Sequence, residues 1–203
     1  GSDPYGYPNT NWLKETLLPR AWQQQHNFTA SGGNNTVRYF LGFGYLNQDA
    51  LYGDTRTNDP TSNFKRYNFR ANIDANLIDK WLTMSGDIAY RREDRNTIPS
   101  ETSFIFENMY RNPQTDPGRF PDGKLGKVSL GQNPIGLVTD GGWVKEQTNT
   151  INSRFVFDLD IPEIKGLNFK GIFAYDKKYI KRKEWISPVN FYSWNTITND
   201  YDT

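Results

Sequence analysis

The clearest pattern in the chain is a strict alternation of apolar and polar residues over positions 66–77. The apolar positions are Tyr67, Phe69, Ala71, Ile73, Ala75 and Leu77. The positions between them are polar, namely Arg66, Asn68, Arg70, Asn72, Asp74 and Asn76. A period of two places the two sets on opposite faces of a β-strand. The run also exceeds the roughly 9–11 residues that a tilted strand needs to cross a bilayer.

Five further segments repeat this design less strictly. They are His26–Ser31, Val37–Tyr45, Trp81–Arg92, Thr150–Ile161 and Leu167–Lys178. Each sets an apolar face against a polar one, which is typical of strands with one face buried and the other in water. Together with 66–77, these segments predict an all-β fold of about six antiparallel strands arranged as three hairpins.

The connections between the predicted strands alternate in length. Residues 32–35, 78–80 and 162–166 form short turns, whereas 47–63, 93–149 and everything after 180 are long. Outer-membrane barrels have this order, with short periplasmic turns and long outer loops. The pattern therefore predicts a segment of an up-and-down β-barrel.

The same pattern divides the whole chain, 1–203, as one fragment of barrel wall. We expect a helical lead-in at 1–22, strands 1–4 at 23–92, a long outer loop at 93–149, strands 5–6 at 150–180 and a further outer loop at 181–203. The long loop should be ligand-facing, since binding residues concentrate on loops that a rigid scaffold positions.

Two short helices are predicted outside the strands. The first has Asn9 or Thr10 as its cap, an apolar stripe from Trp12 to Leu18, and Pro19 at its end. The second spans Ser100–Arg111 within the long loop, with Ser100 as the cap.

Composition narrows the class of protein. Aromatic residues make up 15% of the chain, hydrophobic residues only 35%, and the net charge is +1. This balance gives no basic surface for nucleic acid, and the absence of cysteine excludes disulfides and thiolate metal sites. No apolar run is long enough for a membrane helix, although barrel strands need none. Residues 1–4 do not have a signal-peptide pattern, and we expect the chain to start within a longer protein.

Several stretches, in order, resemble the barrel of the SusC/RagA-type TonB-dependent transporters. The main ones are His26-Asn27-Phe28-Thr29-Ala30-Ser31-Gly32-Gly33, Arg38-Tyr39-Phe40, Gly44-Tyr45-Leu46-Asn47-Gln48 and Asn63-Phe64-Lys65-Arg66-Tyr67-Asn68-Phe69-Arg70. The others are Asn9-Thr10-Asn11-Trp12, Asn133-Pro134, Leu159-Asp160-Ile161-Pro162 and Lys165-Gly166-Leu167. The resemblance covers about residues 9–192.

This resemblance implies nutrient uptake and not catalysis, with no cofactor. The parent protein would import glycan or peptide fragments across the outer membrane of a Bacteroidetes-type bacterium. Its partners would be a SusD-like surface lipoprotein acting as a lid and TonB, which supplies energy. Such transporters have a roughly 22-stranded barrel around a plug. The chain has no recognisable TonB box, plug or closing strands, so the resemblance identifies it as a fragment and assigns energy coupling to none of its residues.

Candidate catalytic and metal-binding residues are few. His26 is the single histidine, which excludes a histidine metal cluster and a Ser-His-Asp triad, and we interpret it as a strand-end or turn residue. The loop aspartates are Asp54, Asp59, Asp116 and Asp122. They lack EF-hand spacing and are interpreted as turn residues.

A pair of carboxylates for glycoside hydrolysis is likewise not indicated. Glu101, Glu107 and Asp94 are the acidic residues near the predicted helix. Nothing in their spacing fixes two carboxyl groups on either side of a substrate. We interpret them as solvated charges.

The aromatic residues fall into two groups. Those near strand ends predict an interfacial girdle, with cross-strand packing as the alternative: Tyr39, Tyr45, Tyr67, Trp81, Tyr90 and Tyr175. Those in loops are candidates for stacking on substrate or contacting a lid, with loop packing as the alternative. The substrate-facing candidates are Phe120, Trp143, Trp185 and Trp194, accompanied by Phe191 and Tyr192. The basic cluster 177–183 faces either anionic lipopolysaccharide or water.

The polar face of 66–77 supplies the lumen-facing candidates, which are Arg66, Asn68, Arg70, Asn72 and Asp74. The alternative from another class is a soluble all-β module that binds carbohydrate or protein, which would need its apolar faces to pack as a sandwich. In water, a six-stranded piece of a wide barrel has two unpaired edges and an apolar face. We therefore expect the isolated chain to curl, split or self-associate, and the complete protein to place this face against outer-membrane lipid.

Overall fold

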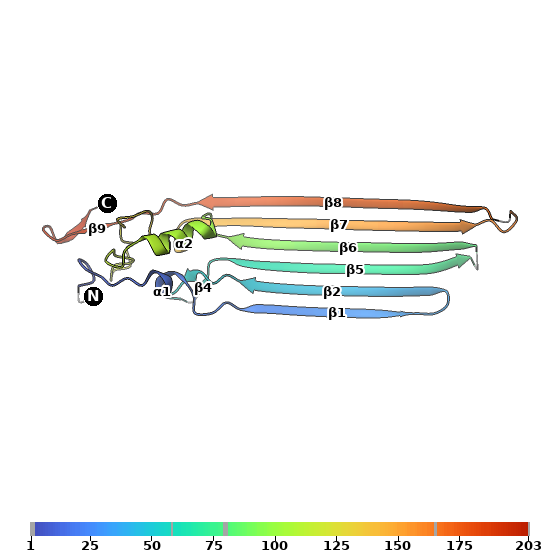
Figure 1. Ribbon diagram of the computed structural model, residues 1–203, viewed down its shortest axis with the longest axis horizontal. Coiled ribbons are helices and arrows are strands. Elements are labelled where there is room, and N and C mark those ends of the chain that lie inside the picture. Colours follow the sequence, from blue (N-terminus) through green and yellow to red (C-terminus); the bar gives the residue numbers. More distant parts are fainter. Residues whose placement is uncertain (1–2, 58, 79–80, 165, 203) are drawn as a thin grey trace.

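The computed structural model describes residues 3–57, 59–78, 81–164 and 166–202. Six long strands form one antiparallel sheet in the order β1-β2-β5-β6-β7-β8, so each long strand pairs with the one before it in the chain (Figure 1). Their bounds are β1 (Gln23–Gly33), β2 (Val37–Asp49), β5 (Asn63–Ile78), β6 (Leu82–Thr97), β7 (Gly142–Asp160) and β8 (Asn168–Ile186). The predicted antiparallel up-and-down fold of six strands is confirmed.

The two ends of the sheet differ. Short turns join the strands at one end, while the helices, the long connections and both chain termini lie at the other (Figure 1). In the β1–β2 turn, the Asn34 side chain accepts hydrogen bonds from the backbone N–H groups of Thr36 and Val37, at 2.8 Å each. The second predicted turn, 78–80, lies partly outside the described residues. The third predicted turn, 162–166, is described except for position 165.

The remaining elements gather at the long-connection end. They are α1 (Trp12–Thr16), β3 (Gly53–Asp54), β4 (Asp59–Pro60), α2 (Thr102–Arg111), α3 (Pro134–Thr139), β9 (Ser193–Asn195) and β10 (Asp200–Asp202). We call the described residues of 3–22, 50–62, 98–141 and 187–202 the loop cap. No helix in the described part of the chain is long and apolar enough to cross a membrane.

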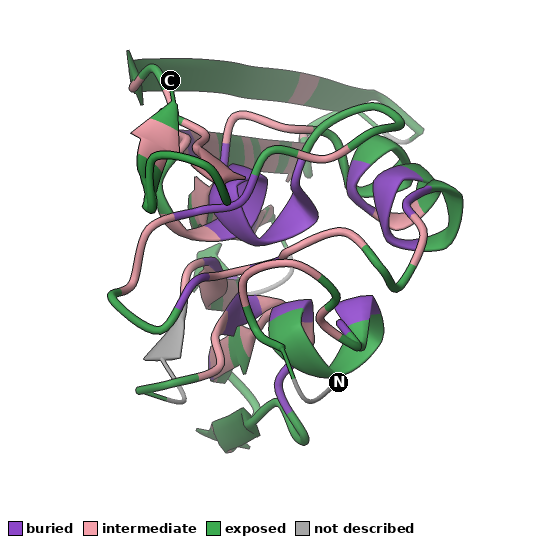
Figure 2. Ribbon diagram, turned by 90° about the vertical axis from the view of Figure 1, so that its left-hand side faces the viewer, coloured by how far each residue is buried: buried purple, intermediate pink, exposed green. Residues whose placement is uncertain are grey.

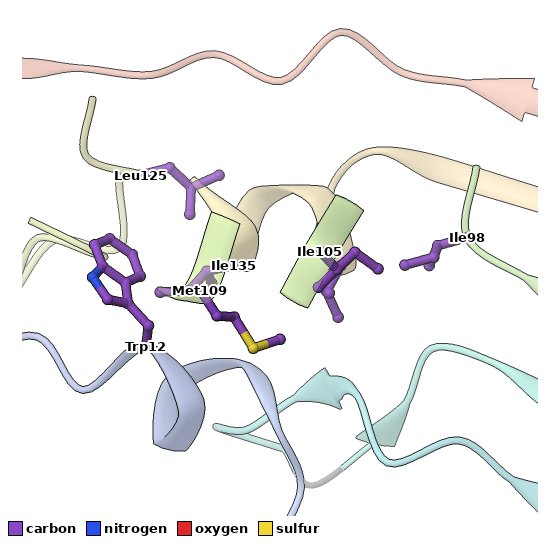
Figure 3. Close-up of a cluster of buried hydrophobic side chains, with 7 residues drawn as sticks. Trp12, Ile98, Ile105, Met109, Leu125 and Ile135 are labelled. Carbon is purple, nitrogen blue, oxygen red and sulfur yellow. The ribbon is translucent and has the colours of Figure 1, made fainter. Parts of the chain in front are cut away.

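The hydrophobic core lies in the loop cap. Its buried side chains come from α1, α2, α3 and the segments between them: Trp12, Ile98, Ile105, Met109, Leu125, Ile135 and Val138 (Figure 3). Viewed from the cap end, buried residues gather in the cap, while the strands behind it are mostly exposed (Figure 2). The cap therefore folds around its own core.

The sheet has no such core. The other two sheets, β3–β4 and β9–β10, have two strands each. In the described residues no second large sheet covers the apolar face of the six-stranded sheet. The sandwich that a soluble binding module would need is thus missing from this part of the chain. The sheet also neither splits nor folds back over itself; it remains one open layer (Figure 1).

Several helix ends differ from the sequence predictions. The cap of α1 is Asn11, not Asn9 or Thr10, because the Asn11 carboxamide accepts the N–H of Lys14 at 3.0 Å. Helix α2 begins at Thr102 with Glu101 in the N-cap position and no side-chain cap, so Ser100 does not cap it. Helix α3 has no counterpart among the predictions.

The strands are longer than their sequence patterns. Strand β6 continues to Thr97, β7 starts at Gly142, and β8 continues to Ile186. These additions extend the sheet into segments expected to be outer loops. A 19-residue strand such as β8 spans about 60 Å, more than twice the apolar band of about 25 Å in an outer-membrane barrel.

Candidate functional site

The register of the sheet assigns each strand residue to one of two faces. One row of paired residues crosses five strands: Tyr45, Tyr67, Arg92, Asn149 and Tyr179. Residues an even number of positions along each strand share the face of this row. We call this the outer face and its opposite the inner face.

The outer face carries a continuous apolar band. Its larger members are Phe28 on β1; Tyr39, Leu41 and Phe43 on β2; Phe69 and Ile73 on β5; Met84 and Ile88 on β6; Phe155, Phe157 and Leu159 on β7; Phe169 and Phe173 on β8. Many are well exposed: Phe28 is 67% exposed and Phe173 59%. Water-soluble proteins seldom expose apolar patches beyond a few hundred Å², so this face is suited to a partner or to lipid.

The upper edge of the apolar band runs obliquely across the strands. We define the edge by the first polar outer-face residue of each strand, so the band ends at Tyr45 before Asn47 on β2 and at Tyr175 before Lys177 on β8. Tyr179, in the row of Tyr45, is a single aromatic residue beyond this edge, between Lys177 and Lys181. Tyr175 lies in the same row as Leu41, which is four residues before Tyr45 on β2. At about 3.3 Å per residue and 4.8 Å per strand, four residues over four strand steps is a slope of about 35°. Barrel strands tilt by that amount against the membrane normal.

The predicted aromatic girdle residues follow this band. Tyr39, Tyr45, Tyr67, Tyr90 and Tyr175 all lie on the outer face. The rings of Tyr45 and Tyr67 lie 5.2 Å apart, so these two residues make the cross-strand packing that was the alternative to a girdle. Trp81 lies in the turn before β6.

The lumen-facing candidates lie together on the inner face of β5. Arg70 is central: its Nη2 is 3.6 Å from the Asp87 carboxylate on β6, and its Nε donates to Asn72 at 3.1 Å. Arg66, Asn68 and Asp74 continue the same face in both directions. The inner face of β5 is therefore polar from Arg66 to Asn76.

Strands β7 and β8 extend this polar inner face. Asn152 donates to Asp176 at 2.7 Å across the two strands. With Arg70, Asp87 and Arg154, these residues line a hollow of about 380 Å³. Positive and negative groups alternate in it, so the hollow offers hydrogen-bond donors and acceptors without favouring one sign of charge.

The partners of β5 on the inner face were not among the predicted site residues. Asp87, Arg154 and Asp176 follow the same alternation in their own segments. What the pattern could not supply is the register, which places Asp87 directly opposite Asn72 and Arg154 opposite Asp87.

The substrate-facing candidates separate into two places. Trp143 on β7 and Trp185 on β8 form a cross-strand pair. They lie on the outer face, above the apolar band, and Trp185 is 61% exposed. The Lys145 ammonium lies 4.7 Å from the centre of the Trp143 ring. This pair is thus on the opposite face from the lumen-facing candidates.

Phe120 and Trp194 lie instead in an aromatic cluster of the loop cap. Both pack against Tyr201, with ring centres 5.2 Å and 5.0 Å away. The Lys124 ammonium lies 3.9 Å from the Tyr201 ring centre. Burial, together with the nearby Asp122 carboxylate, raises the pKa of Tyr201 above its ordinary value. Phe120 is 2% exposed, so in this conformation it supports the cap and offers no surface for stacking.

Phe191 and Tyr192, the other loop aromatics, also pack within the cap. Phe191 contacts the hydrophobic core, and the Tyr192 ring lies 5.8 Å from that of Tyr201. Packing of the cap therefore accounts for both positions.

The remaining candidates have structural contacts. The Asp54 carboxylate binds the Arg56 guanidinium at 2.7 Å, and this bond lowers the pKa of Asp54. Asp116 accepts from the Ser129 backbone N–H at 2.7 Å. Asp122 accepts from the Lys124 backbone N–H at 3.1 Å. The side chain of Asp59 lies outside the described residues. No group of three potential metal ligands occurs in the described ranges.

The carboxylates considered for glycoside hydrolysis do not come together as a pair. Asp94 lies on the outer face of β6, where it accepts from Arg92 and Gln147. Glu107 forms an exposed ion pair with Arg111 at 3.3 Å.

The interpretation of His26 as a strand-end or turn residue is wrong. His26 lies within β1, opposite Tyr45, and the two rings stack at 6.2 Å.

Comparison with known proteins was made by family, by sequence and by fold. No family model matches the chain. A TonB-dependent receptor, P26 of Formosa agariphila, is 32% identical over 82 residues, which are 40% of this chain and 8% of that protein. The fold matches a structure of the RagAB peptide transporter with a TM-score of 0.62 and 17% identity over 89% of this chain. It matches the RagAB peptide importer in the open-open state with a TM-score of 0.63 and 18% identity, again over 89% of this chain.

These relatives are named as receptors or transporters and not as enzymes. The chain spans a small part of them, 20% of each matched RagAB chain and 8% of the receptor. The fold and the stretch of sequence identity agree on the same class of protein, and the predicted resemblance to TonB-dependent transporters of the SusC/RagA type is confirmed.

Proposed function

We propose that this chain forms part of the barrel wall and outer loops of a TonB-dependent transporter, which imports peptide or glycan fragments across the outer membrane of a Bacteroidetes-type bacterium. The oblique edge of the apolar band carries this proposal. A soluble sheet has no reason to end its apolar face along a line sloped by about 35° to its own rows, whereas a flat membrane cutting tilted strands produces that line.

The two faces would then meet different surroundings. The outer face lies in lipid, where its exposed Phe, Leu and Ile side chains are stabilised without a protein core. The inner face, with Arg70, Asp87 and Asp176, lines the lumen or contacts a plug. Charged groups are tolerated there because the lumen is wet.

The edge strands support a larger assembly. Strands β1 and β8 each pair on one side within this sheet, and a bilayer does not tolerate unpaired backbone groups. Further strands of the same barrel would pair with them. The cap stands at the end with long connections (Figure 1), where a SusD-like lipoprotein lid would approach from outside. TonB would act from the opposite side, through parts of the transporter beyond this chain.

Peptides are the first cargo to test. The solved relatives are named as a peptide transporter and a peptide importer. The mixed donors and acceptors of the inner face also suit a peptide backbone with charged ends. Glycan fragments remain the second cargo class, since sugar hydroxyls bind the same groups.

An uptake assay tests the proposal. Cells lacking the gene that carries this chain should lose uptake of fluorescent oligopeptides, and the intact gene should restore it. Replacing the inner-face pair by Arg70→Gln with Asp87→Asn should lower the restored uptake. The matched outer-face variant Ile88→Val should not, provided that both variants reach the outer membrane in equal amounts. Uptake of peptides and oligosaccharides that is unchanged by the deletion would refute the function.

A further inference from the structure

The basic cluster of β8 is divided between the two faces of the sheet. Lys177, Lys181 and Lys183 lie on the outer face, and Lys178 and Arg182 lie on the inner face. The sequence could not decide between lipopolysaccharide and water for the cluster as a whole. The register shows that it is two groups with different surroundings.

The outer-face lysines of β8 meet further lysines from neighbouring strands. Lys183 is directly opposite Lys145 on β7, and Lys181 lies in one row with Gln147, Asp94 and Lys65. These side chains line a hollow of about 460 Å³ on the outer face. We call it the lysine hollow, with Lys65, Lys145, Lys181 and Lys183 as its basic residues.

The lysine hollow has an excess of positive charge. Its one outer-face carboxylate, Asp94, already accepts from Arg92 at 3.0 Å and from Gln147 at 3.0 Å. Within the described part of the chain, none of its four lysines has an ion pair with a carboxylate. Like charges directly opposite one another in a sheet, as at Lys145 and Lys183, are destabilising. An anion in the hollow would relieve this repulsion.

The height of the hollow identifies the kind of anion. On β8, Lys183 is four residues beyond Tyr179, the last outer-face aromatic residue before the hollow, and it is directly opposite Lys145. Four residues correspond to about 13 Å along the strand, or about 11 Å along the membrane normal at a tilt of about 35°. Phospholipid head groups extend only about 5–8 Å beyond the hydrocarbon on each side. A ligand that reaches the Lys145–Lys183 pair must therefore belong to a lipid with a larger head group.

We propose that the lysine hollow binds phosphate groups on the saccharide head of a surface glycolipid of the lipopolysaccharide type. The inference rests on the proposed function, because only a barrel in the outer membrane places this face beside such lipids. Binding holds the glycolipid against β5–β8 above the apolar band. Lys177, two residues beyond Tyr175, lies at the height of phosphates nearer the hydrocarbon.

The test uses the intact transporter in nanodiscs that contain phosphorylated rough lipopolysaccharide in neutral phosphatidylcholine. Bound lipopolysaccharide is counted by native mass spectrometry over a concentration series. The double variant Lys145→Gln with Lys183→Gln should bind about 25-fold more weakly, at about five-fold for each lysine. The matched control, Lys178→Gln with Arg182→Gln, removes two charges from the inner face of the same strand and should leave binding unchanged.

Three comparisons make the result decisive. Dephosphorylated lipopolysaccharide should lose its dependence on Lys145 and Lys183, and phosphatidylglycerol should show none. Equal losses in the two double variants, or competition by millimolar inorganic phosphate as strong as by the glycolipid, would overturn the proposal. Failure of the wild-type protein to place its apolar band in lipid would instead refute the proposed function, and brominated-lipid quenching measures that independently.

Discussion

The sheet and the loop cap both contain many hydrophobic residues, but most of the buried ones lie in the cap, whereas many of those in the sheet are exposed. Twelve hydrophobic residues are buried in the described structure, and only Ala75 and Val144 belong to the sheet. The sheet instead exposes large apolar side chains such as Phe28, Phe169 and Phe173, each more than half exposed. Figure 2 makes the same contrast visible, with burial gathered in the cap.

The difference matches the surroundings that the proposed function gives the two regions, water for the cap and lipid for one face of the sheet. The cap closes its own core, as a protein in water must. The sheet leaves its apolar face open and satisfies its backbone polar groups by pairing within the sheet, as a lipid-facing wall requires. The exposed residues of the two regions thus agree with the proposed placement of the sheet in lipid and of the cap in water.

The largest expected effect tests the core of the cap. Ile105 is 0% exposed, and Ile105→Ala should lower the free energy of unfolding of the cap by about 2–5 kcal/mol, because a cavity replaces its packed side chain. Tyr110→Ala on the same helix is the control, since Tyr110 is 74% exposed. Denaturant unfolding followed by hydrogen exchange in α2 measures both. Equal losses would mean that the cap has no core of its own.

The next effect tests the face assignment in the sheet. Ile73→Arg puts a charge in the middle of the apolar band and should destabilise the folded barrel in lipid by about 2–4 kcal/mol. Asn72→Arg, one residue earlier and on the inner face, should cost far less because the lumen is wet. Urea unfolding from lipid vesicles compares the two variants. A larger loss for Asn72→Arg would reverse the two faces.

The smallest effect concerns acid and the β3–β4 hairpin of the cap. The hydrogen bond from Arg56 lowers the pKa of Asp54 in the folded state, so the bond contributes stability above the unfolded pKa of about 4. That contribution is lost as the pH falls through the lower folded value. For a pair this exposed it should amount to about 0.2–1 kcal/mol. The protection factors of amides near Gly53, which correct for the intrinsic pH dependence of exchange, should fall in acid for the wild type, and Asp54→Asn should abolish this fall.

The sheet could be predicted from sequence because its surroundings change with a period of two. In the proposed barrel each strand of the band would meet lipid on one face and a wet lumen on the other, and the resulting alternation over 66–77 is sufficient to identify a strand. Above the band both faces would be wet, and the alternation is less regular there. For this reason the ends of β6, β7 and β8, at Thr97, Gly142 and Ile186, were not apparent.

The fold of the cap could not be predicted from local patterns because it is stabilised by contacts between residues far apart in the sequence. Helix α3 is six residues long, and its residues Pro134–Val138 are all buried, so it has no polar stripe to reveal a helical period. Asn133 accepts from Ile135 N–H and donates to the backbone oxygens of Gly118 and Gly126. Neither distant partner is visible in a local pattern.

Only one part of the candidate site, the polar face of β5, could be predicted from the sequence. Alternation placed Arg66 to Asp74 on one face of β5, but the choice of Phe120 and Trp143 as substrate contacts rested only on their being loop aromatics. The structure buries Phe120 in the cap, and Trp143 lies on the outer face of β7. Tertiary packing and strand register determine where Phe120 and Trp143 lie, and neither can be inferred from residue type alone.

The most direct test of the central claim is lipid contact read residue by residue. The chain contains no cysteine, so single cysteines at Phe69, Arg70, Ala71, Asn72 and Ile73 can be labelled with an environment-sensitive fluorophore in the reconstituted transporter. Brominated lipids should quench positions 69, 71 and 73 strongly and positions 70 and 72 weakly. Uniform quenching, or none at 69, 71 and 73, would contradict the assignment of the outer face to the membrane.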